Sequence, residues 1–193
     1  MKTTLLTCLF LLVLVSMISA QRAGSGSVPA STRSAVKSEF PGISAALLTK
    51  LKYAKTRLQF PLPTWLPAGF AMDRIEMKLG EDVALEDKQF VVVYSKAMGR
   101  GKFQKFAIET GFDGLGDLPY ETTAVNSKVG KIGLAYQPID PNTGKRWPGY
   151  SRTDWFDVGG KFSYVYDGMY GDEEVVMISR SDTIKILQSM KKY

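Results

Sequence analysis

Side chains that commonly carry out catalysis are scarce in this sequence. It contains no histidine, and its single cysteine is Cys8, so a Ser-His or Cys-His catalytic pair and histidine-based zinc sites are excluded. No G-x-S-x-G nucleophile motif and no glycine-rich phosphate-binding loop is present. We therefore expect a protein that is not an enzyme and that has no cofactor.

One arrangement in the sequence, carboxylates beside aromatic residues, is compatible with hydrolysis of a glycan. Two carboxylates can cleave a glycosidic bond, and aromatic faces can bind sugars. The candidate glycan site consists of Asp154, Trp155, Asp157 and Asp167, and its aromatic platform would be Trp147, Tyr150, Trp155 and Tyr170. This pattern indicates the alternative function, a carbohydrate-binding or carbohydrate-cleaving envelope protein.

The competing interpretation is that the aromatic residues of this region form the core. Phe162, Tyr164 and Tyr166 alternate along the sequence, so they share one face of a strand. We favour this interpretation for the aromatics that lie on strands.

The glycine-rich segment 111–120 contains Asp113 and Asp117 and raises the question of a metal site. A calcium loop would need several more oxygen ligands at fixed spacing and a closing glutamate, which are missing. The segment therefore predicts a turn region, and we expect no metal.

The loop 137–150, QPIDPNTGKRWPGY, carries our first choice of binding residues. They are Lys145, Arg146, Trp147 and Tyr150. A loop of this length without periodicity is often functional, and Arg and Trp dominate the energetics of many interfaces. The leading hypothesis is an exported, non-enzymatic domain that binds a protein or a cell-envelope component, with a possible regulatory role.

Residues 1–20 have the composition of a secretory signal peptide. Lys2 gives a positive start, an apolar run extends from Leu5 to Ile18, and the small residues Ser19-Ala20 suit cleavage after Ala20. A single membrane anchor is the alternative, but the apolar run is shorter than the roughly 20 residues that span a bilayer. We expect export to the periplasm or the extracellular medium, with no stable membrane span and no thiol after cleavage.

The charge of the chain is moderately basic, with 25 Lys and Arg against 19 Asp and Glu. Cleavage removes only Lys2, which leaves 24 − 19 = +5. Because export removes nucleic acid as a natural partner, this charge suits an anionic membrane surface or an acidic envelope polymer, or it serves only solubility.

Small, polar residues without periodicity predict a flexible linker at 21–40, and the periodic segments that follow predict one α+β domain at 41–193. We expect a mainly antiparallel, twisted sheet with an N-terminal amphipathic helix at 43–58 and a C-terminal helix at 182–191, capped by Ser181, packed on it. The predicted strands are 70–79, 88–96, 102–110, 122–126, 131–136, two strands within 151–166 joined by Gly159-Gly160, and 175–178.

The segment Tyr53–Phe70, YAKTRLQFPLPTWLPAGF, resembles the opening of a bacterial extracytoplasmic domain family of unknown function. That family occurs in secreted proteins and on the outer side of anti-sigma factors. Its domains begin with a helix that ends in a Phe-Pro step, two proline-centred anchors and a Leu-Pro-x-Gly-Phe or Tyr turn. They close with a Trp-containing strand, a glycine turn, an aromatic strand and a short helix with a Ser-Met or Ser-Leu pair, here Ser189-Met190.

The shorter stretch Trp65–Phe70 also resembles the C-terminal domain of the periplasmic sigma-regulator family MucB/RseB. Together the resemblances imply an extracytoplasmic α+β domain with a binding or regulatory role and no catalytic residues. An anti-sigma factor has a transmembrane helix joined to a cytoplasmic segment, and this sequence shows neither. Direct control of a sigma factor is therefore not expected.

Overall fold

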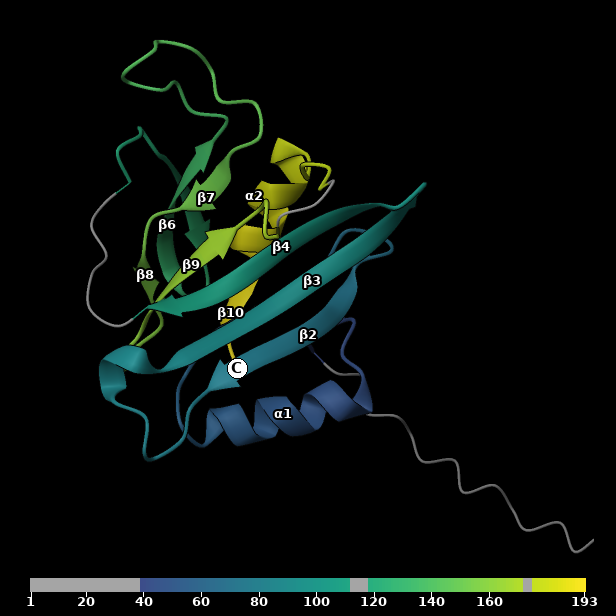
Figure 1. The fold of residues 1–193 in the computed structure, drawn as a ribbon, viewed down its shortest axis with the longest axis vertical. Coiled ribbons are helices and arrows are strands. Elements are labelled where there is room, and N and C mark those ends of the chain that lie inside the picture. The colour runs from purple at the N-terminus through teal and green to yellow at the C-terminus, as the bar shows by residue number, and fades with distance from the viewer. Residues whose placement is uncertain (1–38, 112–117, 172–174) are drawn as a thin grey trace, which may run out of the picture. The chain divides into compact units, whose positions relative to one another are not determined.

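A computed structural model of the chain describes residues 39–111, 118–171 and 175–193. The predicted signal peptide, the linker up to Ser38, Asp113 and Asp117 lie outside the described residues. Within them the architecture is α+β and mostly antiparallel sheet (Figure 1).

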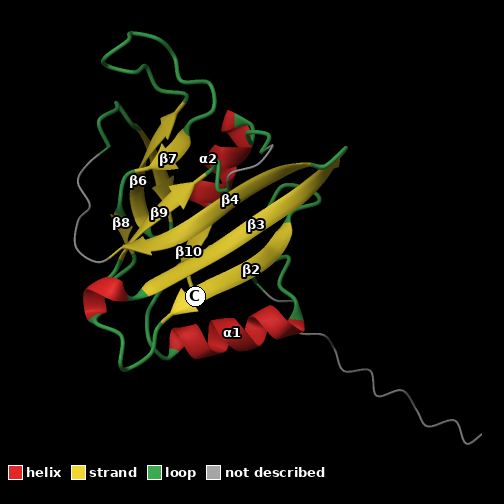
Figure 2. Ribbon diagram, in the orientation of Figure 1, coloured by secondary structure: helices red, strands yellow, loops and turns green. Residues whose placement is uncertain are grey.

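Helix α1 (Ala45–Lys55) lies within the stretch 43–58 that has helical periodicity. The Ser44 hydroxyl caps its first turn by accepting a hydrogen bond from the Leu47 N–H at 3.3 Å. Leu51 and Ala54 are buried, whereas Lys50, Lys52 and Lys55 are exposed. The helix therefore contributes one apolar stripe to the core, next to β2 (Figure 2).

Three long strands follow as an antiparallel meander: β2 (Ala71–Lys78), β3 (Gln89–Gly99) and β4 (Lys102–Gly111). A short 3₁₀ helix, Leu85–Asp87, precedes β3. The register places Ile75 opposite Val92 and Val92 opposite Ile108, so these buried side chains form one row across the sheet.

The sheet continues from β4 through strands that come later in the sequence. They are β9 (Ser163–Asp167), β7 (Ser151–Thr153), β6 (Gly130–Tyr136) and β5 (Thr123–Ser127), and the full order is β2-β3-β4-β9-β7-β6-β5. Strand β8 (Phe156–Asp157) pairs with β9. All strand pairs in this sheet are antiparallel, as the sequence predicts.

The aromatic hairpin within 151–166 differs from the prediction in its turn. Strands β8 and β9 do pair, with Phe156 opposite Tyr164, but the connection runs from 158 to 162. Gly159 and Gly160 lie inside it with φ of 87° and 109°. The turn is longer than two residues because Phe162 is buried in the core and does not continue the strand.

Residues 175–178 form no strand, contrary to the prediction. Val175 makes an isolated parallel bridge with Phe103, and the Val176 N–H donates to the Phe103 carbonyl oxygen at 2.7 Å. Strand β9 pairs with β4 only over residues 107–111. The apolar segment contacts the first half of β4 through Phe103 and through the Gln104 side chain, which donates to the Met177 carbonyl oxygen at 3.3 Å, but it forms no ladder.

The last helix, α2 (Arg180–Gln188), begins and ends earlier than predicted. Ser179, not Ser181, is the N-cap, because its hydroxyl accepts from the Asp182 N–H at 3.1 Å. Ser189 ends the helix, and Met190–Lys192 form β10, which pairs with β1 (Pro61–Pro63) in a separate two-stranded sheet. The last residues of the predicted helix therefore belong to a strand.

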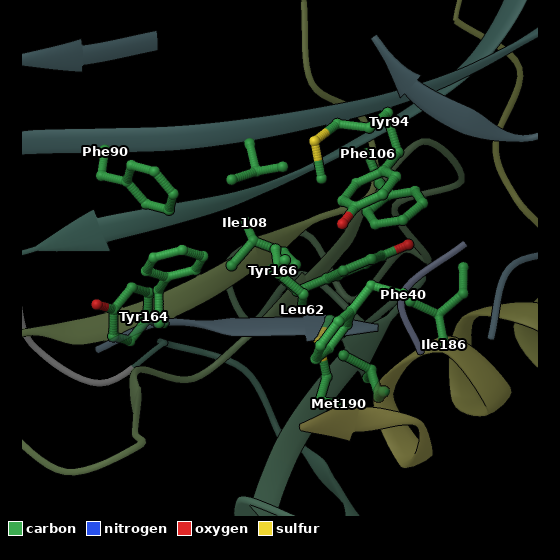
Figure 3. Close-up of a cluster of buried hydrophobic side chains, with 14 of the residues drawn as sticks. Phe40, Leu62, Phe90, Tyr94, Phe106, Ile108, Tyr164, Tyr166, Ile186 and Met190 are labelled. Atoms are coloured by element: carbon green, nitrogen blue, oxygen red, sulfur yellow. The ribbon is translucent and has the colours of Figure 1, made fainter. Parts of the chain in front are cut away.

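The core fills the space between the large sheet, the two helices and the β1–β10 pair. Tyr94 and Phe106 stack with ring centroids 4.7 Å apart, and Tyr166 lies 5.3 Å from Phe106 (Figure 3). Leu62 of β1, Ile186 of α2 and Met190 of β10 are fully buried in the same cluster. Within the described residues, no helix is long and apolar enough to cross a membrane.

Candidate binding site in the loop between β6 and β7

The segment 137–150 joins β6 to β7 and extends beyond the ends of both strands in Figure 1. Its two arms are held together by backbone contacts. The Asp140 N–H donates to the Lys145 carbonyl oxygen at 2.8 Å, and the Trp147 N–H donates to the Pro138 carbonyl oxygen at 2.9 Å. Ile139 and Arg146 form an antiparallel bridge between these contacts. The loop is therefore a small folded-back unit with a defined shape.

The tip of this loop is fixed by the Asp140 side chain. Its carboxylate accepts hydrogen bonds from the Asn142 N–H and from the Thr143 hydroxyl, each at 2.9 Å. The Asn142 backbone bond, followed by the Thr143 bond, lowers the pKa of Asp140. Gly144 then turns the chain back with a φ of 65°.

Arg146 lies between two cavities. Its guanidinium donates to the Gln137 carbonyl oxygen at 3.0 Å, which directs the side chain across the loop. The larger cavity, about 660 Å³, is lined by Tyr120, Thr123, Tyr136, Ile139, Arg146 and Arg180, among others. Arg180 comes from the start of α2, so this cavity joins the loop to a distant part of the chain.

The smaller cavity, about 260 Å³, is lined by Lys145, Arg146, Trp147 and the loop tip. Three of the four predicted binding residues therefore meet around one hollow. Trp147 is 47% exposed, which leaves much of its indole ring available to a ligand.

Tyr150, the fourth predicted residue, packs against Trp147 and Tyr120. Its ring centroid lies 5.2 Å from that of Trp147 and 5.1 Å from that of Tyr120, and Tyr120 contacts Trp147 edge to face at 6.1 Å. Burial raises the pKa of the Tyr150 phenol. This aromatic cluster of Tyr120, Trp147 and Tyr150 fixes the base of the loop.

The predicted glycan residues lie elsewhere, and each carboxylate has its own partner. Asp154 accepts from the Thr122 hydroxyl at 3.0 Å, and Asp157 accepts from the Ser163 hydroxyl at 2.7 Å. Asp167 accepts from the Met169 N–H at 2.9 Å and lies 3.7 Å from Arg152. None of these three residues lines either of the two cavities described above.

The last glycan candidate, Trp155, packs over the backbone of β4. A Cβ atom placed on Gly111 would come within 2.6 Å of its indole ring. Trp155 therefore covers the sheet at a point where only glycine leaves enough room, and it too lies outside the lining of both cavities.

Tyr120 and Arg180 are among the residues at the larger cavity that are absent from the site predicted by sequence. Tyr120 precedes β5 and Arg180 begins α2, so both are far from the loop in sequence. Loop length and composition identify neither of them, since their place at the site depends on the pairing of β5 with β6 and on α2 lying beside β5.

Within the described ranges, no group of three or more Asp, Glu, His or Cys side chains is placed to hold a metal ion. Comparisons with protein-family models, curated proteins and solved structures find no match to this chain.

Proposed function

We propose that this chain is an exported, non-enzymatic domain that binds a protein or a cell-envelope component through the loop 137–150. The observation that supports this proposal most directly is the position of Arg146 between two cavities, beside the half-exposed Trp147. The resemblance to an extracytoplasmic domain family and to MucB/RseB supports a regulatory form of that role.

The loop is suited to binding because its shape is set before a ligand arrives. Backbone bonds across its arms and the Asp140 contacts at its tip fix the positions of Arg146 and Trp147. A preordered surface loses less conformational entropy on binding, and Arg and Trp are the residue types that most often dominate interface energies.

The charge around the loop favours an anionic group on the ligand. Arg146 and Arg180 line the larger cavity, where Glu121 is the one carboxylate. Lys145 lines the smaller cavity, where Asp140 is the one carboxylate. The Asp140 carboxylate is already engaged by the loop tip. Ile139, which is 59% exposed, adds an apolar contact beside these cations.

The non-enzymatic role rests on the absence of histidine from the sequence and on the place of Cys8 within the predicted signal peptide. Carbohydrate cleavage is the less favoured function because Asp154, Asp157 and Asp167 are each held by separate hydrogen bonds.

The binding site is tested with the double variant Arg146→Ala and Trp147→Ala, by crosslinking and pull-down from intact cells. The matched control is Lys102→Ala with Met98→Ala, an exposed cation and apolar residue at the β3–β4 turn. We expect the loop variant to lose partners that the control retains. Recovery of the same partners by both variants would show that the loop is not the binding surface.

The carbohydrate alternative is tested by incubating the protein with cell-wall polysaccharide and scoring retention and released sugars. We expect neither signal. Release of sugars would contradict the non-enzymatic role, and retention abolished by changing Trp155 would place the site on the glycan candidates.

Export is tested by the intact mass of the mature protein. We expect a mass that lacks residues 1–20, and a mature chain that still contains Cys8 would contradict this part of the proposal.

A further inference from the structure

Within the described residues, one edge of strand β5 has no paired strand. Among the described strands, only β6 pairs with it. The Gly133 carbonyl oxygen, opposite Ala124, accepts from the Asp154 N–H on the β7 side at 2.9 Å. The Ala124–Gly133 pair is therefore a non-hydrogen-bonded pair, and the N–H and C=O groups of Ala124 point away from β6. Alternation along the strand gives Asn126 the same orientation.

The opposite edge of the sheet, at β2, is protected. The Met72 N–H donates to the Gly42 carbonyl oxygen at 2.9 Å, and the Lys50 ammonium lies 3.5 Å from the Ile75 carbonyl oxygen. Strand β2 also carries four charged residues, Asp73, Arg74, Glu76 and Lys78. Charges and covering segments are the usual means by which proteins block strand addition.

Strand β5 has none of these protections within its own sequence. Its residues, TAVNS, include no charge and no proline, and all except Val125 and Ser127 are exposed. The contrast between the two edges indicates that β5 is suited to accept another strand.

Cations lie at both ends of this edge, and they outnumber Glu121, the carboxylate that lines the cavity at its start. Arg180 reaches Thr123 at the start of β5, with 3.5 Å between the guanidinium and the hydroxyl, and Arg146 lies across the same cavity. At the other end, Lys128 and Lys185 line a cavity of about 330 Å³ together with Trp65. Helix α2 thus runs beside β5 in the same direction, and its charged residues are Arg180, Asp182 and Lys185.

We infer that the edge of β5 binds an extended, acidic polypeptide segment as an added β-strand. Backbone hydrogen bonds to Ala124 and Asn126 would supply affinity, and the cations at either end would select acidic side chains. A second copy of this chain fits less well, because pairing β5 with β5 would bring two positively charged borders together. The inference rests on the proposed function only in taking a polypeptide as the ligand.

The first test uses unchanged protein and a fluorescein-labelled, seven-residue synthetic peptide of alternating threonine and glutamate. Two matched peptides are compared with it: one carries N-methyl groups on the amides of one edge, and one has lysine in place of glutamate. We expect the parent peptide to bind, with fluorescence anisotropy weakening as salt rises. The N-methylated peptide should bind about tenfold more weakly, because it lacks donors for the strand edge. The lysine peptide should also bind more weakly.

The second test changes the protein. Asn126→Pro removes an outward N–H, which an edge strand tolerates, and leaves the bonds to β6 in place. Arg180→Glu with Lys128→Glu reverses the border charge, and the glutamate at the start of α2 suits the helix dipole. We expect both variants to bind the parent peptide about tenfold more weakly than the control Lys102→Glu. A thermal unfolding curve checks that each variant is folded, and the peptide comparison above stands even if Asn126→Pro is not.

Three outcomes of the peptide comparison would overturn the inference. They are absence of parent peptide binding, equal binding of the N-methylated peptide, and equal binding of the lysine peptide. A dimer in sedimentation that Asn126→Pro dissociates would identify a second copy as the occupant and would also overturn it. The loop proposal is judged separately, by partner recovery with the Arg146 and Trp147 variant, so either proposal can fail while the other stands.

Discussion

The Ser189 carbonyl oxygen accepts two hydrogen bonds from Thr64, one from the backbone N–H at 3.1 Å and one from the hydroxyl at 2.9 Å. Thr64 follows β1 and Ser189 ends α2, so this contact ties together segments 125 residues apart. The next residue, Met190, is fully buried at the start of β10. The β1–β10 pair is therefore part of the core and not a loose extension.

Met190→Ala should lower the free energy of unfolding by about 2–5 kcal/mol, because it leaves a cavity beneath β1. Urea denaturation measures this change. Lys192→Ala, an exposed residue of the same strand, is the control and should change stability by about 0.5 kcal/mol or less. Equal effects of the two substitutions would contradict the structural role given to β10.

Tyr164→Phe should destabilise the protein more than Tyr166→Phe, although both rings are fully buried. The Tyr164 hydroxyl donates to the Gln59 carbonyl oxygen, so its removal should cost about 1 kcal/mol. The Tyr166 hydroxyl is buried beside the hydroxyls of Thr183 and Ser151, and among the described residues none of the three makes a hydrogen bond of good geometry, so its removal should change stability by less than about 1 kcal/mol. Denaturant unfolding of the two variants, measured side by side, decides the matter, and greater destabilisation by Tyr166→Phe would refute it.

Glu109→Gln should stabilise the protein at neutral pH. Burial, together with the nearby charge of Asp167, raises the pKa of Glu109, an effect that Arg152 opposes and Glu76 reinforces. The Glu109 carboxyl group therefore stays protonated in the folded state at pH values where it is ionised in the unfolded chain. The stability that Glu109 provides is present below the unfolded pKa of about 4.3 and is lost as pH rises through its folded pKa.

Unfolding curves measured between about pH 3 and about pH 8, a range that includes the unfolded glutamate pKa of about 4.3, test this prediction. The difference between Glu109→Gln and the wild type should grow as pH rises through the window. Glu86→Gln, which changes an exposed residue of the 3₁₀ helix, is the control for the loss of one carboxylate. A pH-independent difference for Glu109→Gln would argue against a raised pKa.

Asp140→Ala should loosen the tip of the binding loop. The substitution removes the acceptor for the Asn142 N–H and the Thr143 hydroxyl, so the Asn142 amide should exchange its hydrogen faster. The pKa of Asp140 is lowered in the folded state. The wild-type loop tip is therefore fixed at pH values above the unfolded pKa of Asp140, and it loosens as the pH falls through the folded pKa.

Amide exchange measured by NMR checks this loosening, with Lys145→Ala as a control that leaves the Asp140 contacts in place. Unchanged exchange at Asn142 in Asp140→Ala would show that the tip does not depend on this carboxylate.

The strands that sequence predicts well are those with clear alternation or a continuous apolar run. The ends of strands β2, β3 and β4 lie no more than three residues from the predicted ranges, because Ile75, Val92 and Ile108 mark their buried faces. The aromatic interpretation also holds: Phe162, Tyr164 and Tyr166 are all buried.

The differences arise where tertiary contacts decide between local preferences. Val175 to Ile178 is as apolar as a strand, but β4 offers it one bridge at Phe103 and no full ladder. Ser189 and Met190 suit a helix, yet burying Met190 against β1 favours a strand. Neither outcome can be read from periodicity, since each depends on a partner far away in the sequence.

The candidate site shows the same limit. Sequence identifies the loop with Arg146 and Trp147, because a long loop with these residue types stands out. It does not bring Tyr120 or Arg180 to that loop, since strand order and the position of α2 determine which residues line the larger cavity.

The pairing of β1 with β10 also sets the order of events during synthesis. Leu62 and Met190 fill the same core, but the ribosome makes Leu62 long before Met190. Contacts of such high sequence separation slow folding, because a long loop must close before they form. Until residues 190–192 have emerged, the cluster around Leu62 lacks its cover, so the nascent domain stays incompletely folded and open to whatever machinery receives it.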